Sequence, residues 1–404
     1  MNNIKEKKLV FLKIVFCYYI FISFLFPRGY ISLNNTYKIF STMLIWSSVL
    51  LILIYIGIKN IKKGGLNRKL IIEKNYINII FYFILVILIT IIRRGELTGL
   101  QQLIAYPSIC IFTISFGKKN LKILLNCVNN IMLILFILNI LMNKLFFIEQ
   151  YHITFLGHVQ MISQIGVLAV FTVMLYDILY NEKKIRKNII IILVGITLII
   201  TDASLALMTA ILLIVLFIVS KTRFNKVLLL DSKIYIVLGI IFSIVIVLIS
   251  ICNNVYNNNY ISWLDFSGRS FVWKDALTKI FMNPLLGYGL YGILIQTFWN
   301  KWSNSGGFNY AHNQILQNFL DGGIVLSIVF VYMLFSFCKN VKYISNRKCK
   351  ILCNSVLIAI LNIMIFESPT IYCYYIICLS IIYILSMLSK EKFIKKGEKN
   401  GVNS

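Results

Sequence analysis

The chain has 404 residues, of which 59% are hydrophobic, and it carries a formal net charge of +26 at pH 7. This composition is typical of a polytopic membrane protein and excludes an ordinary soluble domain. So large a positive charge also suggests nucleic-acid binding. The basic residues, however, are spread over connections too short to fold into a basic domain, so we expect no nucleic-acid partner.

Apolar segments of about 16–22 residues recur along the chain, the length that a helix needs to cross roughly 30 Å of hydrocarbon. We therefore predict an all-α polytopic membrane protein in which residues 1–404 form one integral membrane domain with about twelve transmembrane helices. The fourth expected span contains Pro107 and the seventh is short. The expected spans are 9–26, 37–58, 76–92, 102–116, 123–142, 161–180, 188–200, 204–220, 234–251, 323–338, 351–366 and 372–388.

Clusters of lysine and arginine separate many of these segments, from Lys5-Glu6-Lys7-Lys8 near the start to 390–399 near the end. With twelve spans, these clusters all fall on one side, as the positive-inside rule expects of cytoplasmic loops. Both termini are then cytoplasmic. The first span has no cleavage site behind it, so it is predicted to be a membrane helix and not a signal peptide.

One outward connection, residues 252–322, is far longer than the usual two to eight residues between neighbouring helices, which predicts a function for it. It holds four of the five tryptophans. Aromatic faces would stack on the sugar rings of a glycan, whereas an aromatic belt at the membrane interface is the alternative. These tryptophans are Trp263, Trp273, Trp299 and Trp302.

Within this large extracytoplasmic loop, Ser267 is placed to cap a helix over 268–282, which Asn283-Pro284 would end. The helix has one apolar face and one polar face, which predicts that it lies on the membrane surface. Arg269 stands in its first turn, so its guanidinium and the open backbone N–H groups could bind a diphosphate; contact with lipid headgroups is the alternative. The predicted apolar face comprises Val272, Ala276, Leu277, Ile280 and Phe281.

After this helix, Gly287-Tyr288-Gly289 predicts a turn that allows close backbone approach. A second helix is then expected to begin near Asn309 and to continue into the tenth span.

A polar stripe runs along this second helix, because Asn313, Gln317 and Asp321 are spaced four residues apart. His312 stands beside it at the membrane boundary, where polar side chains are costly unless they serve a function. A histidine can accept a proton from a sugar hydroxyl near neutral pH, and a purely structural role is the alternative.

Other outward residues are weaker candidates. Arg93 and Arg94 face outward against the general charge pattern, so they could hold an anion or contact headgroups. Asp202 and Glu367 are acids that could pair with these arginines. Neither of the other two histidines has a cysteine or carboxylate at ligand spacing, so no metal is predicted. No nucleotide-binding signature is present, and no cofactor is predicted.

The chain resembles the O-antigen polymerase and ligase superfamily, which comprises the Wzy-type glycan polymerases and their ligase relatives. The late, large external loop and the cytoplasmic ends are similar. So are two motifs, which read here Gly268-Arg269 with Trp273 and Pro284-x-x-Gly287-x-Gly289, and Ala311-His312-Asn313 with Leu316-Gln317 and Asp321-x-Gly323.

One difference concerns the short turn before the eighth span. The family often carries Ser-Arg there, whereas this chain reads Thr201-Asp202-Ala203-Ser204-Leu205. Arg93 and Arg94 are the candidates to replace the missing arginine.

The resemblance implies a glycosyltransferase at the outer face of the cytoplasmic membrane of a bacterium. It would polymerise undecaprenyl-diphosphate-linked oligosaccharide units in capsule, O-antigen or exopolysaccharide synthesis. Arg269 would stabilise the diphosphate and His312 would orient or deprotonate the acceptor hydroxyl, without a metal. Further expected substrate-binding residues are Arg93, Arg94, Trp273, Gly287, Gly289, Asn313, Gln317 and Asp321.

Two alternatives remain open. A ligase, which moves finished glycan to a different acceptor, would share every motif. A flippase or transporter of lipid-linked sugar is expected to carry intramembrane charges, broken helices and internal repeats instead of one dominant external loop, and no repeat is visible between the halves. We favour the polymerase because ligation to lipopolysaccharide requires an outer membrane and the composition indicates an AT-rich source. Its expected partners are membrane lipids, a chain-length regulator and a flippase.

Overall fold

The computed structural model describes residues 2–32, 34–63, 74–94, 99–146, 153–182, 184–201, 204–255, 269–296 and 307–401. The α-helices in these ranges are α1 (Asn2–Phe24), α2 (Asn35–Lys63), α3 (Lys74–Ile92), α4 (Leu100–Phe146), α5 (Val159–Tyr180), α6 (Lys184–Thr201), α7 (Ser204–Lys221), α8 (Ser232–Val255), α9 (Arg269–Met282), α10 (Gln314–Cys338), α11 (Arg347–Phe366) and α12 (Tyr374–Gly401). Short 3-10 helices are η1 (Gly29–Ser32), η4 (Arg223–Leu229), η6 (Val341–Tyr343) and η7 (Pro369–Ile371).

The strands are only two residues long and form two antiparallel pairs. β1 (Ile153–Thr154) pairs with β2 (Gly157–His158), and β3 (Ile295–Gln296) pairs with β4 (Gly307–Phe308).

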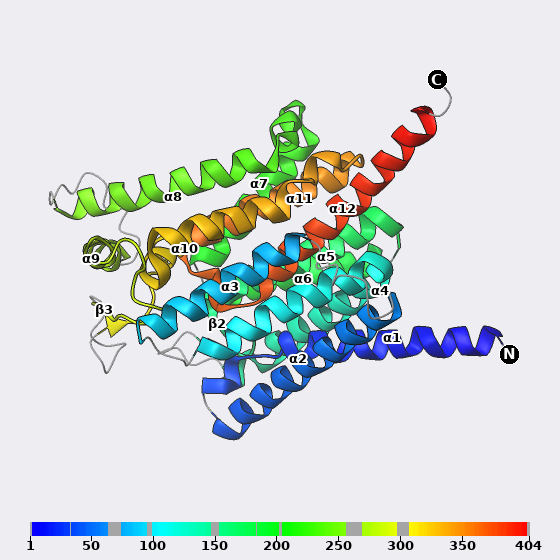
Figure 1. Cartoon of the computed structure of the whole chain (residues 1–404), viewed down its shortest axis with the longest axis horizontal. Coiled ribbons are helices and arrows are strands. Elements are labelled where there is room, and N and C mark those ends of the chain that lie inside the picture. The colour runs from blue at the N-terminus through cyan, green and yellow to red at the C-terminus, as the bar shows by residue number, and fades with distance from the viewer. Residues whose placement is uncertain are drawn as a thin grey trace.

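The helices form a bundle, and α9 is seen end-on in Figure 1, crosswise to α8 and α10. Among the described residues, seven helices are long and apolar enough to cross a membrane: α2, α4, α5, α7, α8, α10 and α11. The prediction of an all-α membrane protein is therefore confirmed, whereas the count of twelve spans stays a prediction.

Helix α4 covers two of the expected spans because the chain reverses inside it. Asn120 has non-helical angles, φ −131° and ψ 39°. Tyr106 interacts electrostatically with Arg28, and the Arg28 N–H donates to Leu156 O at 3.0 Å. The Leu156 N–H donates in turn to Asn139 Oδ1 at 3.1 Å. A straight helix would separate Tyr106 from Asn139 by about 50 Å, so the two halves must return to the same end of the bundle.

The start of α1 and the end of α12 lie at the same end of the bundle, and α9 and β3 lie at the opposite end (Figure 1). This common placement agrees with an even number of crossings. The end with α9 and β3 is the one to which the sequence assigns the large loop.

The described parts of this loop are the end of α8, then α9 and the turn after it, the β3–β4 pair, and the segment that leads into the first turns of α10. Ser267, Gly268 and three of its four tryptophans, Trp263, Trp299 and Trp302, lie outside the described residues. Asp202 of the short turn before α7 does too.

Helix α9 follows its predicted range and ends at Met282. Val272, Trp273 and Ala276 are fully buried against the bundle, whereas Phe281 is 78% exposed. The predicted apolar face was wrong at Phe281, because nine helical steps of 100° place it opposite Val272. The exposed Phe281 and Met282 suit contact with the membrane surface.

Helix α10 is broken at Gly322 (φ −154°, ψ 18°) and Gly323 (φ 62°, ψ −158°). Backbone groups freed within a membrane must find partners, and here the turn after α9 supplies them. Its hydrogen bonds are Tyr288 N to Leu320 O (2.7 Å), Gly289 N to Asp321 O (3.1 Å) and Ile324 N to Pro284 O (2.8 Å).

Candidate functional site

His312 has a left-handed backbone conformation, with φ +48°. Its neighbour Ala311 is held on both sides: the Ala311 N–H donates to Gln317 Oε1 at 2.8 Å, and Ala311 O accepts from Trp273 Nε1 at 3.0 Å. Such conformations are unfavourable for residues with a Cβ and persist where surrounding contacts determine them. The contacts to Ala311 therefore fix the position of His312.

The second helix begins at Gln314 and not near Asn309, which corrects the expected start. Asn313 is its N-cap, and its Oδ1 accepts from Ile315 N at 2.9 Å and from Leu316 N at 3.0 Å. Its Nδ2 donates to Ser243 Oγ and Ile365 O, both at 2.9 Å. An amide has two donors and two acceptor positions, and all are occupied here. Asn313 thus joins α10 to α8 and α11, and the structure does not favour its expected substrate contact.

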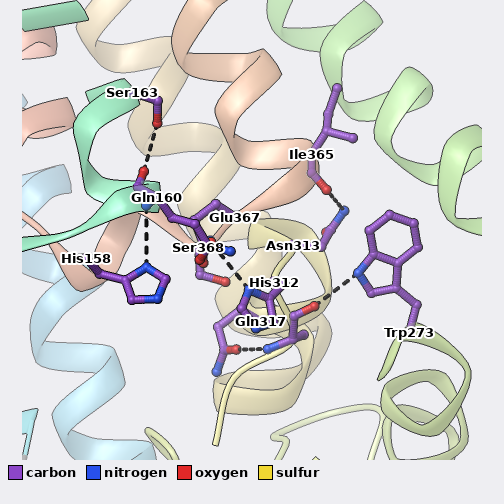
Figure 2. Close-up of polar contacts among 11 residues, drawn as sticks. His158, Gln160, Ser163, Trp273, His312, Asn313, Gln317, Ile365, Glu367 and Ser368 are labelled. Carbon is purple, nitrogen blue, oxygen red and sulfur yellow. Dashed lines mark hydrogen bonds and ion pairs between the residues drawn. The ribbon is translucent and has the colours of Figure 1, made fainter. Parts of the chain in front are cut away.

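His312 and Glu367 form a buried pair, with Nδ1 and Oε2 3.3 Å apart (Figure 2). Their relative exposures are 6% and 2%. Burial alone would raise the pKa of Glu367, but His312, Arg269 and a hydrogen bond from Ser368 N together hold it below its ordinary value. An ionised carboxylate only accepts hydrogen bonds, so the proton of this contact lies on Nδ1 of His312.

Gln160 joins Arg269 to Glu367 from the first turn of α5. With its amide oriented as its neighbours require, its oxygen accepts from Arg269 Nη2 at 3.2 Å and its nitrogen donates to Glu367 Oε2. Figure 2 shows this side chain beside Glu367, and His158 caps the same helix by accepting from Gln160 N at 3.4 Å. The sequence offered no signal for Gln160, because it stands at the start of an ordinary apolar helix.

Arg269 occupies the first turn of α9, as predicted, and is half-buried. Burial lowers its pKa, while Glu367 and Tyr310 oppose this effect. A guanidinium remains cationic in a protein at any working pH. The structure therefore brings the two expected catalytic residues, Arg269 and His312, into one cluster around Glu367. The sequence had suggested this acid as a partner of other arginines, those at the end of α3.

A second arginine, Arg28, lies near this cluster. Its guanidinium is 5.4 Å from the centre of the Tyr372 ring. Tyr372 interacts electrostatically with Glu367 and with Tyr310, whose ring lies 4.3 Å from that of His312. Sequence reasoning missed Arg28, although it stands in an outward connection against the charge pattern, the same signal that singled out Arg93 and Arg94.

Arg93 and Arg94 are exposed at the end of α3. Thr90, one turn earlier, accepts a hydrogen bond from Leu290 N at 3.0 Å and so contacts the turn after α9. The two arginines therefore lie at the same end of the molecule as the cluster. Their contact with a substrate stays a prediction.

Three of the expected substrate-binding residues lie against other backbone segments and do not face an open surface: Trp273, Gly287 and Gly289. Trp273 is fully buried, so a sugar cannot stack on it in this structure. Gly287 and Gly289 have φ of +58° and +85°, and a Cβ on Gly287 would lie 2.3 Å from Leu320 O. The predicted close approach is present, but the group approached is the broken helix α10.

Gln317 and Asp321 follow His312 along α10, further into the bundle. Gln317 Nε2 donates to Asp321 Oδ1 at 2.8 Å, and the same oxygen accepts from Tyr291 N at 3.2 Å. Both side chains are buried, so they support the His312 segment and the turn after α9. Their direct contact with a substrate stays a prediction.

Among the described residues, no three His, Cys, Asp or Glu side chains lie together as a metal site would require. A reaction without a metal or cofactor stays a prediction.

The cluster is thus a buried His–Glu pair bordered by one arginine, with a second arginine nearby. Such a set can move a proton and hold a multiply charged anion. No curated protein and no solved structure gives a significant match to the chain. Residues 188–331 match a family model, Wzy_C, described as O-antigen ligase. This range contains Arg269, Trp273 and His312, and the members of this family are glycosyltransferase-like enzymes, either polymerases or ligases. The match over residues 188–331 agrees with the resemblance to the O-antigen polymerase and ligase superfamily that the motifs indicated.

Proposed function

We propose that this protein polymerises lipid-linked oligosaccharide units by glycosyl transfer from an undecaprenyl-diphosphate donor. The observation that carries the proposal is the convergence of Arg269, His312 and Glu367 at one end of the membrane bundle. A sugar diphosphate is already an activated donor. The protein therefore needs to hold the leaving diphosphate, align the acceptor hydroxyl and accept its proton.

The His312–Glu367 pair suits the proton transfer. In the neutral form of His312, a proton held on Nδ1 by Glu367 places the lone pair on Nε2, which we assign as the base. Nε2 removes the proton of the acceptor hydroxyl as the oxygen bonds to C1 of the donor sugar. Burial of both side chains keeps their orientation fixed, and positioned bases of this kind contribute about 10²–10⁴ in rate.

Arg269 stabilises the negative charge that develops as the C1–O bond breaks and the electron pair passes to the leaving diphosphate. Gln160 positions this guanidinium through the hydrogen bond to Nη2. Arg28 is the second cation in this proposal and takes the place of the arginine missing before α7. Two guanidinium groups would supply the countercharge without a metal.

The two arginine hypotheses make different predictions. Arg28→Gln should raise the KM for the lipid-linked donor about tenfold, because a charge-assisted hydrogen bond contributes roughly 1.5–3 kcal/mol in a protein. Arg93→Gln and Arg94→Gln should leave the KM unchanged, since both side chains are exposed at the end of α3. Donor titration with each variant distinguishes the hypotheses, and the reverse pattern would favour the arginines of α3.

We place the reaction at the outer face of the cytoplasmic membrane, with both termini in the cytoplasm. The basic connections support this orientation, and the termini lie at the end of the bundle opposite α9 (Figure 1). A chain-length regulator and a flippase are the proposed partners, and capsule, O-antigen or exopolysaccharide synthesis is the proposed context.

A ligase is the second candidate, because the matching family model is described as O-antigen ligase. The chemistry at the donor would be the same, and only the acceptor hydroxyl would differ. The family match gives no support to the flippase alternative.

The test is the size distribution of surface glycan in the source organism without this protein, complemented with wild type, Arg269→Ala or His312→Ala. Arg223→Ala, an exposed arginine of η4, is the matched control and should restore long chains. Single repeat units that neither site variant lengthens would support a polymerase. Long lipid-linked chains left unattached would identify a ligase, and units retained on the cytoplasmic leaflet would identify a transporter.

A further inference from the structure

A cavity of about 530 Å³ lies far from this cluster, where α4 reverses at Asn120. It is bordered by residues 118–123 of α4, the end of α5 and residues 385–392 of α12. α12 ends on the side of the bundle that carries both termini (Figure 1). The cavity is therefore at the opposite end of the molecule from His312.

The cavity is positively charged. Four lysines line it: Lys118, Lys119, Lys122 and Lys392. Glu182 offsets one of these charges through its ion pair with Lys122, at 2.8 Å between Nζ and Oε1. The surplus favours an anion, because four ammonium groups around one cavity repel one another unless a counter-charge is present.

The remaining wall of the cavity is mixed, with an aliphatic part from the same three helices. The aliphatic part comprises Leu121, Ile123, Leu179, Leu385 and Leu388, and the polar part comprises Asn120, Tyr180 and Ser389. A soluble phosphate would need only the lysines, whereas a phospholipid needs cations for its headgroup and an apolar wall for the first part of its acyl chains. Basic pockets between transmembrane helices are recognised sites of this kind.

We propose that this cavity binds the phosphate headgroup of an anionic phospholipid from the leaflet on the terminal side of the bundle. The bound lipid bridges the reversal of α4 to α12 and stabilises both. This inference does not depend on the glycosyl-transfer proposal, since the two sites lie at opposite ends of the helices.

The experiment measures thermal unfolding of the full chain in neutral detergent with a thiol-reactive dye, because eight of the nine free cysteines are buried. Phosphatidylglycerol should raise the unfolding midpoint in a saturable manner, whereas phosphatidylcholine with the same acyl chains should not. Lys119→Gln combined with Lys392→Gln should raise the half-saturating phosphatidylglycerol concentration about 25-fold, or about fivefold for each lysine. Both lysines are exposed, so the variant should fold.

The matched control is Lys226→Gln combined with Lys233→Gln, which removes the same charge from exposed positions outside the cavity. It should keep the wild-type half-saturating concentration. Equal weakening in the two double variants would overturn the proposal, because attraction would then come from total charge alone. An equal stabilising effect of inorganic phosphate, or of phosphatidylcholine, would overturn the assignment to an anionic lipid.

Discussion

The substitution Glu367→Gln tests how the buried pair performs the reaction. It retains the shape of the side chain but removes the charge that holds the proton on Nδ1 of His312, 3.3 Å away. Since a positioned general base contributes about 10²–10⁴ in rate, we expect the elongation rate to fall about 100- to 1000-fold. The assay follows glycan length over time with purified protein and lipid-linked repeat units, at saturating donor.

Two controls separate this effect from a general loss of folding. Glu182→Gln removes an acid at the opposite end of the bundle and should leave the elongation rate unchanged. In a His312→Ala background, Glu367→Gln should reduce the remaining rate less than about threefold, because residues that act through one another are not additive. Normal elongation by Glu367→Gln, or fully multiplicative effects in the double variant, would refute the pair as the base.

Three further results are expected. Trp273→Phe should slow elongation about two- to tenfold at saturating donor, because it loses a hydrogen bond worth roughly 0.5–1.5 kcal/mol that holds the His312 segment. Gly323→Ala should destabilise the protein by about 1–3 kcal/mol in thermal unfolding, since φ 62° with ψ −158° suits only glycine. Gly195→Ala is its control, because a Cβ there meets nothing within 4 Å. Folding lowers the pKa of Glu367. The ionised side chain therefore contributes its full share to the free energy of unfolding at a pH above its pKa in the unfolded chain, and this share is lost as the pH falls through its pKa in the folded protein. The difference in unfolding midpoint between wild type and Glu367→Gln should therefore stay constant from neutral pH to about pH 5 and narrow only in stronger acid; a difference that widens in acid would contradict this sign.

Local patterns in the sequence were sufficient for the membrane class and the position of α9, and they singled out Arg269 and His312 as candidate site residues. Apolar length, helix-ending signals and motif spacing depend on neighbouring residues only, so they can be read without a fold. The same reasoning could not tell whether a polar side chain faces a ligand or its own backbone. Asn313 and Trp273 were expected to bind substrate, and both are instead used in hydrogen bonds that fix the His312 segment.

Only the tertiary structure decided which residues share the cluster. Gln160, Arg269 and Glu367 come from the ends of three different helices, and they are more than 90 residues apart in the chain, so no local pattern relates them. Arg28 reaches their neighbourhood because its own connection packs against Tyr372. The physical reason is that burial and charge pairing depend on which helix ends meet. The packing of the whole bundle determines which helix ends become adjacent, and this cannot be read from the residues on either side of each one in the sequence.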